Sequence, residues 1–129
     1  MKCHAPGDHC DKARAAILTN LTLLDQSIKD ADQSLRLAES SGMEVSEARL
    51  SQDQAQDSIT KARVTIHTFQ TALVDQDIQA GMKIAAANLK AGQDAMVERN
   101  HRRIGLSICL LAIAFMLVGL WLYIKKLES

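Results

Sequence analysis

Apolar residues recur along much of the chain at intervals that alternate between three and four. In the first such stretch they are Ile17, Leu21, Leu24, Ile28, Ala31, Leu35 and Ala38. This is the a/d pattern of a helix that buries one stripe against partner helices. Ser40-Ser41-Gly42 should end the helix, because glycine adopts the left-handed conformation that follows many helix C-termini. The pattern therefore predicts a first helix over about 9–41.

A second stretch has the same spacing and predicts a helix over about 44–69. Its pattern positions are Val45, Ala48, Gln52, Ala55, Ile59, Ala62, Ile66, Phe69 and Leu73. Gln52 is the only polar residue among them. The connection around Gly42 is short, so the second helix should run antiparallel to the first.

The third helix is predicted over about 71–103, after a turn at 68–71 that carries β-branched residues at both ends. The alternative is one unbroken helix through this turn. The pattern positions of the third helix are Val74, Ile78, Gly81, Ala85, Leu89, Gly92 and Met96. Glycine inside a helix costs about 1 kcal/mol relative to alanine. We therefore expect Gly81 and Gly92 to be there because they permit close helix contact.

Residues 104–124 form an uncharged, almost wholly apolar run. About 20 apolar residues in a helix cross roughly 30 Å of hydrocarbon. Arginines precede the run and lysines follow it, and Trp121 and Tyr123 lie where amphipathic rings favour the membrane interface. The alternative is the buried core helix of a soluble protein. Nothing between Gly92 and Ile104 should break the third helix.

The predicted fold class is therefore all-α: an antiparallel three-helix bundle that continues into one C-terminal transmembrane helix. In this reading residues 9–103 form the bundle, 104–124 the transmembrane helix and 125–129 a short tail. The lipid bilayer is then the first expected partner.

The charge pattern excludes several classes of function. The net charge is zero, and the five Lys/Arg and one Glu from Arg99 onward carry +4, so the preceding body carries −4. A nucleic-acid-binding protein would need a basic face, so no nucleic-acid partner is expected. The carboxylates are dispersed and no nucleophile motif is present, so the chain is not expected to be an enzyme.

The residues most suited to chemistry are at the N-terminus. Cys3-His4 has the form of the end of a C-x-x-C-H haem attachment motif, in which two thiols bind the haem and the histidine ligates the iron. Taken by itself, the dipeptide favours the alternative of an ordinary exposed pair. Cys3, His4, His9 and Cys10 also have the ligand types of a zinc site, and a Cys3–Cys10 disulfide is sterically conceivable in an oxidising compartment.

The wider sequence resembles a known family. CHAPGDHCDKA is followed by SGMEVSEARL, by ARVTIHTF and by the basic-flanked apolar run. This order resembles the C-terminal part of membrane-anchored multihaem c-type cytochromes, of the cytochrome c3 or doubled CXXCH type. In those proteins the last C-x-x-C-H leads into a helical bundle and one membrane span. The resemblance implies bound haem c, electron transfer and redox partner proteins or an upstream haem domain.

Under this resemblance, residues 1–8 are a truncated haem-attachment segment. Cys3 binds the haem and His4 is the proximal iron ligand. The start of the first helix and the end of the second should meet at one end of the bundle, which makes His67 the expected distal ligand and His9 its competitor. The alternative is that His67 only caps the second helix or hydrogen-bonds a backbone carbonyl. The first attachment cysteine is missing from this chain. The chain is therefore either a piece of a longer protein or a carrier of at most one singly attached haem.

The resemblance also sets the expected location. Haem c is assembled outside the cytoplasm, so a single-pass protein with a periplasmic body and a cytosolic C-terminus is predicted. The flanking charges alone do not decide this orientation. The alternative function is a tail-anchored coiled-coil tether or assembly protein without a cofactor. Both hypotheses, the cytochrome and the tether, allow self-association through the helix stripes.

Overall fold

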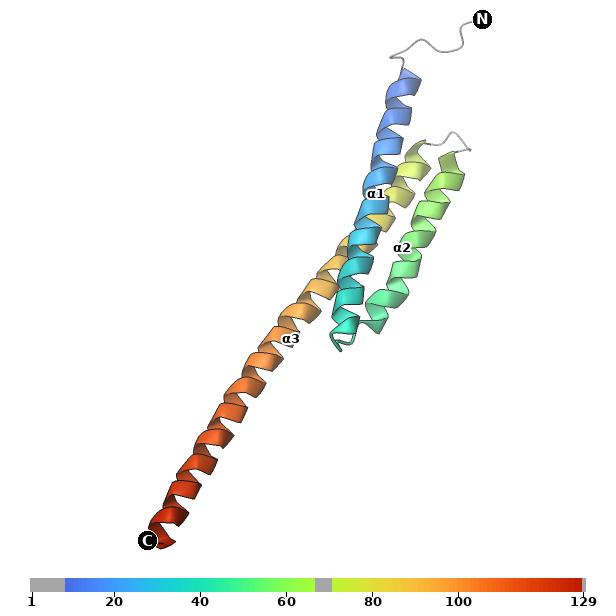
Figure 1. Ribbon diagram of the computed structural model, residues 1–129. Helices are drawn as coiled ribbons and strands as arrows, with labels where there is room; N and C mark the ends of the chain where they lie inside the picture. Colours follow the sequence, from blue (N-terminus) through green and yellow to red (C-terminus); the bar gives the residue numbers. More distant parts are fainter. Residues whose placement is uncertain (1–8, 67–70, 129) are drawn as a thin grey trace, which may run out of the picture. The chain divides into compact units, whose positions relative to one another are not determined.

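The described chain is helical throughout, apart from the short α1–α2 connection. The computed structural model describes residues 9–66 and 71–128, with side chains from residue 12 onward except residue 13. It contains helices α1 (His9–Ser40), α2 (Ser46–Thr65) and α3 (Thr71–Glu128), and no strand among these residues (Figure 1). The predicted all-α class is confirmed. The chain divides into two units, Met1–Ala95 and Met96–Ser129.

The connection between α1 and α2 is set by one glycine. Gly42 has a φ of 77°, in the left-handed region. The Met43 N–H donates to the Ala38 carbonyl at 3.0 Å and the Gly42 N–H to the Glu39 carbonyl at 2.9 Å. These two bonds form a Schellman motif, which satisfies the last carbonyls of α1. The predicted helix stop at Gly42 is confirmed.

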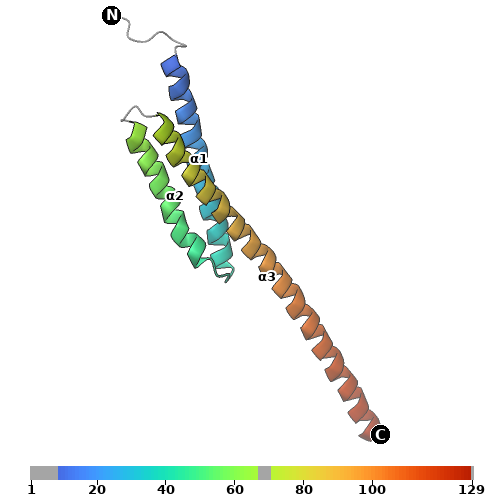
Figure 2. The same cartoon turned by 180° about the vertical axis from the view of Figure 1, so that it is seen from behind.

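The chain reverses again between α2 and α3. The Thr65 hydroxyl lies 3.1 Å from a carboxylate oxygen of Asp77, and Asn88 Nδ2 donates to Gln52 Oε1 at 2.8 Å. Residues early in α2 therefore pair with residues late in this part of α3, so the two helices are antiparallel (Figures 1 and 2). The alternative of one unbroken helix is wrong. Residues 67–70, which include most of the predicted turn, lie outside the described residues.

The bundle core in unit Met1–Ala95 is built from residues of all three predicted stripes. The buried apolar residues are Leu24, Ile28, Ala31, Leu35, Ala38, Val45, Ala55, Ile59, Ala62, Val74, Ile78 and Ala85. Ile17 and Leu21 are partly buried against this core. The prediction that Leu73 is the last position of the second stripe is wrong. Leu73 belongs to α3 and is 45% exposed, because the chain has already reversed before it.

The stripe of α3 also differs from the prediction at one position. Asn88 is buried and 3% exposed, whereas Leu89, the predicted position, is only partly buried. The buried residues of α3 are Val74, Ile78, Gly81, Ala85, Asn88 and Gly92, which keep the strict alternation of four and three. The buried positions of α3 therefore follow the regular helical period, even where the residue is polar. Asn88 can be buried because its side chain hydrogen-bonds Gln52.

Two glycines allow α3 to approach its neighbours closely, as predicted. A Cβ at Gly81 would lie 2.9 Å from Ser58 Cβ and 3.0 Å from Leu24 Cδ1. A Cβ at Gly92 would overlap Ser34 Oγ and lie 2.9 Å from the Ser34 carbonyl carbon. The helix-propensity cost of these glycines is thus offset by contact with α1 and α2.

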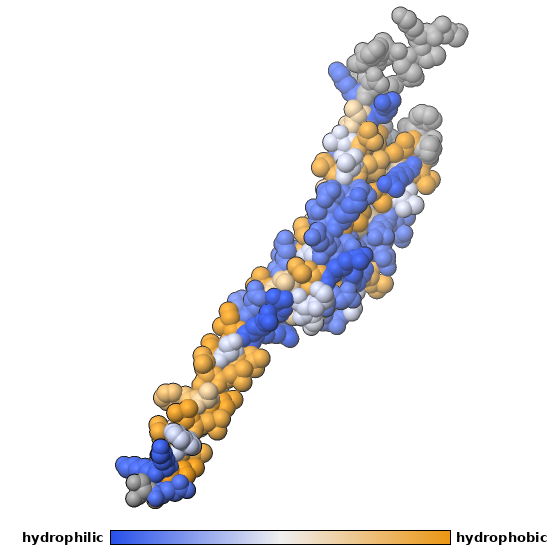
Figure 3. All heavy atoms as spheres, viewed as in Figure 1, coloured by the Kyte–Doolittle hydropathy of each residue, from blue (hydrophilic) through white to orange (hydrophobic). Residues whose placement is uncertain are grey.

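The second unit, Met96–Ser129, is the continuation of α3. No helix end occurs near Ile104, as predicted. The apolar run is fully exposed, with none of its most apolar window buried, and α3 is long and apolar enough to cross a membrane by length and composition. Figure 3 shows hydrophobic residues along this part of α3 and hydrophilic residues at its end. Near that end Lys125 Nζ lies 5.2 Å from the centre of the Trp121 ring.

Candidate functional site

The predicted haem residues fall mostly outside the described part of the chain. Cys3, His4 and His67 are among the residues whose structure is not described, and His9 is the first residue of α1 with its side chain likewise outside. Among the described residues no group of three or more His, Cys, Asp or Glu is placed to hold a metal ion. The haem ligand set therefore stays a prediction.

The helices that flank these residues share one end of the bundle. Ile66, the residue before His67, packs against the same core cluster as Ile17 and Leu21 of α1. α1 extends from Ile17 back to His9, eight residues or about 12 Å of helix. Its first turns lie beyond the end of α2 in both views (Figures 1 and 2). The start of α1 and the end of α2 are thus at the same end, offset along the bundle axis.

A buried polar layer joins all three helices near the other end. Gln52 Nε2 donates to the Ile28 carbonyl of α1 at 2.7 Å, and Asn88 Nδ2 donates to Gln52 Oε1 at 2.8 Å. The Ser51 hydroxyl lies 2.6 Å from Asn88 Oδ1. Gln52 and Asn88 are 2% and 3% exposed. We call Ser51, Gln52 and Asn88 the polar layer.

The polar layer can specify structure but offers no acid–base chemistry. Its groups are two amides and a hydroxyl, and each amide has its polar atoms paired. Buried amides in an a/d position fix register, because any other alignment would leave them without partners. The sequence singled out Gln52 as the one polar stripe position. Continuing the heptad spacing from Ala85 would also have predicted Asn88 as a buried position. The polarity of Asn88 instead favoured Leu89 as the predicted position.

An ion-pair network holds α1 to α2 beside this layer. Arg49 of α2 contacts Asp32 of α1 at 2.6 Å and Glu39 of α1 at 2.9 Å, and Asp32 also pairs with Arg36 at 2.7 Å. Hydrogen bonds to Glu39 first, and then to Asp32, raise the pKa of the Arg49 guanidinium. The network keeps a fixed positive charge between carboxylates, which suits a structural role.

Two exposed carboxylates have lowered pKa values for local reasons. Hydrogen bonds from the Ser46 hydroxyl and backbone N–H lower the pKa of Glu44, just before α2. A hydrogen bond from Lys29, one turn along α1, lowers the pKa of Asp25. Both effects stabilise helix ends or helix surfaces, and neither carboxylate is prepared to act as a proton acceptor.

Two open grooves border the polar layer. One, between α2 and α3, is lined by Glu44, Val45, Ser46, Glu47, Ala48, Ser51, Ala87, Asn88 and Ala91. The other, over α1 and α2, is lined by Asp32, Arg36, Glu39, Ser46, Arg49, Leu50, Gln52, Asp53 and Gln56. Both are shallow surfaces with small or charged side chains, unlike the concave apolar sites that bury small ligands.

The chain was compared with protein families, curated proteins and solved structures. No family model, no curated protein and no solved structure matches it. Its function must therefore be argued from its own residues and fold.

Proposed function

We propose that this chain is the membrane-anchoring helical part of a c-type cytochrome that takes part in electron transfer. What carries the proposal is the order of elements in the structure. A three-helix bundle follows the Cys3-His4 segment, and its last helix continues without a break into an apolar run of membrane-spanning length. This is the architecture that the resemblance of the sequence implies.

The proposed roles fall on four residues. The Cys3 thiol forms a thioether to the haem and the His4 imidazole ligates the iron on one side. His67 is the proposed second ligand and His9 its competitor. The shared bundle end supports this assignment, because Ile66 and the start of α1 flank these residues. Haem c with two histidine ligands supplies one-electron transfer without an open iron position.

The experiment is to complete the attachment motif and look for covalent haem. Placing a cysteine directly before Met1 creates Cys-Met-Lys-Cys-His, a full C-x-x-C-H. Expressed with the maturation machinery for c-type cytochromes, this chain should carry covalent haem with a low-spin optical and EPR spectrum. A Cys3→Ala variant is the control and should lose the two-thioether product. If the chain with the added cysteine carries no covalent haem, the proposal is overturned.

The ligand assignment is tested by two further variants. His67→Ala should convert the haem to a high-spin form, whereas His9→Ala should leave the low-spin spectrum unchanged. The reverse result would transfer the distal role to His9. An unchanged spectrum in both variants would remove both residues from the site.

A second candidate function is a membrane-anchored tether that assembles with partner helices and binds no cofactor. The observation that favours it is the polar layer, since a polar residue at an a/d position is a device by which coiled coils specify register and partner number. If this is the function, the full chain in detergent should be a defined oligomer by light scattering. Its state should change when Gln52 and Asn88 are replaced by apolar residues. A monomer in both forms would exclude self-assembly.

A further inference from the structure

The shallow groove between α2 and α3 has a floor of short, uncharged side chains. The residues of this floor are Ala48, Ser51, Ala87, Asn88 and Ala91. Two helices approach to an axis separation of about 8 Å where the side chains between them are small. The groove therefore suits another helix laid along it better than it suits a compact small ligand.

One face of α3 carries a second apolar stripe, apart from the buried one. Leu73, Ala80 and Ala87 follow each other at intervals of seven residues, close to two helical turns, so they share a face. Leu73 is 45% exposed and both alanines are exposed. We call these three residues the outer stripe. Because Ala87 also lines the groove, a helix that packs on the outer stripe enters the groove as well.

Two unpaired charges lie on opposite sides of the outer stripe. Glu47 of α2 lines the groove together with Ala91 of α3, so these two residues are at the same level of the bundle. Lys90 directly precedes Ala91, but at about 100° per residue it lies on the side of the stripe that is turned away from α2. Glu47 and Lys90 are exposed, and neither forms an ion pair among the residues that the structure describes.

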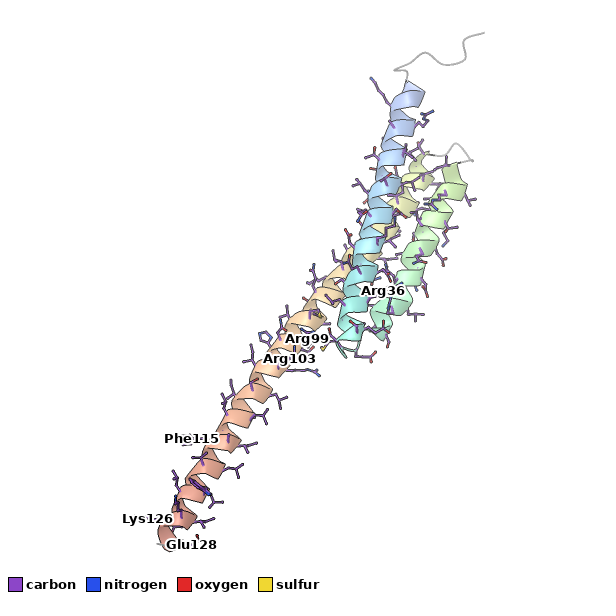
Figure 4. The ribbon with its side chains drawn as sticks, in the orientation of Figure 1. Arg36, Arg99, Arg103, Phe115, Lys126 and Glu128 are labelled. Carbon is purple, nitrogen blue, oxygen red and sulfur yellow. The ribbon has the colours of Figure 1, made fainter. Side chains whose placement is uncertain are left out.

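The groove over α1 and α2 is different, because its arginines are neutralised within the chain. Arg36 (Figure 4) and Arg49 both contact Asp32, at 2.7 and 2.6 Å. Arg49 also contacts Glu39 at 2.9 Å. Of the two grooves, the one between α2 and α3 thus combines short side chains with charges that are available to a partner.

A second copy of α3 fits this groove in shape and in charge. A helix seated in a groove touches both walls, so a copy that packs outer stripe on outer stripe meets α2 with the side that carries Lys90. In a parallel twofold pair, identical residues lie at the same level. Lys90 of each copy is therefore level with Glu47 of the other, and opposite charges meet twice.

We propose that the groove between α2 and α3 docks α3 of a second copy of this chain, in a parallel twofold pair that joins Lys90 of each copy to Glu47 of the other. The parallel direction rests on membrane anchoring by residues 104–124, which is part of the proposed function, because chains with one topology run the same way. The pair is independent of haem. It uses a surface other than the polar layer.

The packing is tested by two neighbouring alanines. The full chain in detergent should be a dimer by sedimentation equilibrium. Ala87→Phe fills the groove and should raise the dissociation constant about tenfold or more, as overpacking does. Ala86→Phe is the matched control, because Ala86 is also exposed but lies farther round the helix from the outer stripe. Equal effects of the two substitutions would overturn the proposal, and so would a monomeric parent chain, which would leave the groove to a different protein.

The charge pairing is tested by reversal and rescue. Lys90→Glu should raise the dissociation constant about tenfold at low salt, since two exposed pairs are lost. Glu47→Lys/Lys90→Glu should restore the parent value, a result that damage to the fold does not produce. Asp94 follows one turn after Lys90 and brings a like charge toward the start of α2, so Asp94→Asn should strengthen the pair. A double reversal as weak as the single one would overturn the contact.

The arrangement in a membrane is tested by cross-linking. Chains with the native cysteines replaced by serine carry either Glu47→Cys or Lys90→Cys and are reconstituted together in phosphatidylcholine vesicles. Oxidation should join one chain of each kind, whereas either variant alone should stay unjoined, because its two introduced thiols lie on opposite sides of the twofold axis. Equal joining in the unmixed samples would overturn the arrangement.

Failure of the anchor is distinguishable from failure of the pair. A chain that alkaline carbonate extracts from the vesicles is not anchored, and that result overturns membrane anchoring and the parallel pair together. A firmly inserted chain that is monomeric and does not cross-link overturns only the pair.

Discussion

At the scale of single residues, Asn88 shows how a buried amide is tolerated in a small core. Its side chain donates to Gln52 and accepts from Ser51, while Gln52 reaches across to the Ile28 carbonyl. A buried amide without partners would cost about 1–3 kcal/mol. The layer is therefore stable only as a set, and this makes a clear prediction.

Replacing one member of the pair should be more harmful than replacing both. Asn88→Leu leaves Gln52 Oε1 buried without a donor, and Gln52→Met leaves Asn88 Nδ2 without an acceptor. Each should lower the free energy of unfolding by about 1–3 kcal/mol. The double variant should lie close to the parent, because both partners are removed at once. Urea unfolding of the full chain in detergent, followed by circular dichroism, measures this. Additive losses would show that the two amides do not depend on each other.

Gly92 lies where α3 approaches Ser34 of α1 too closely for a larger residue. Alanine is the better helix former by about 1 kcal/mol, yet its Cβ would overlap the Ser34 side chain. Gly92→Ala should therefore lower the unfolding free energy by about 1–3 kcal/mol, the usual effect of overpacking. Gly105→Ala is the control, because a Cβ at Gly105 has no neighbour within 4 Å. If Gly92→Ala stabilised the bundle, α3 would have room to move away from α1.

At the scale of the helix, stability depends on which side of each helix a residue occupies. Ile59 of α2 is 7% exposed, within the core cluster, whereas Leu50 of the same helix is 69% exposed. The two side chains have similar size, and only the first loses contact with water. The helical period therefore separates two chemically similar residues into core and surface.

We expect Ile59→Ala to lower the unfolding free energy of the bundle by about 2–5 kcal/mol, through lost burial and the cavity left behind. Leu50→Ala should change it by less than about 0.5 kcal/mol, as surface substitutions usually do. Thermal melts of the full chain in detergent would show the difference as a lowered Tm for Ile59→Ala alone. Equal melts for the two variants would mean that the a/d assignment of α2 fails in solution.

At the scale of the whole molecule, α3 belongs to two environments. Its first part packs in the bundle through Val74 and Ile78, while the apolar run of its second part is fully exposed. Exposed apolar surface of this extent is stable only in contact with lipid or protein. Together with the proposed haem assembly outside the cytoplasm, this leads to a prediction of topology.

The bundle is predicted on the periplasmic side and the residues after Ile124 in the cytosol. Protease added to intact spheroplasts should then digest the bundle, while a tag placed after Ser129 should survive until the membrane is permeabilised. Complete protection of the bundle would reverse the orientation and count against the cytochrome proposal. Recovery of the chain in the soluble fraction would exclude the membrane anchor itself.

Much of this architecture is determined locally, and local features can be read from the sequence. The alternating stripe of α1, the glycine stop at Gly42 and the uninterrupted apolar run each depend on neighbouring residues within one or two turns. The stripes of α1 and α2 were accordingly predicted almost position by position, and so was the continuity of α3.

What the sequence left undecided depends on contacts between residues distant in the chain. Asn88 is acceptable in the core only because Gln52, on another helix, meets its amide, and no local pattern carries that information. Leu73 looked like a member of the second stripe until the chain reversal placed it on α3. The same limit applies to the haem candidates Cys3, His4, His9 and His67. Whether they form one ligand set depends on the distances between separate segments of the chain, which the sequence does not give. The sequence alone thus determined the elements and their apolar faces, whereas only the tertiary structure decided which polar side chains are buried together, since pairing across helices compensates their desolvation.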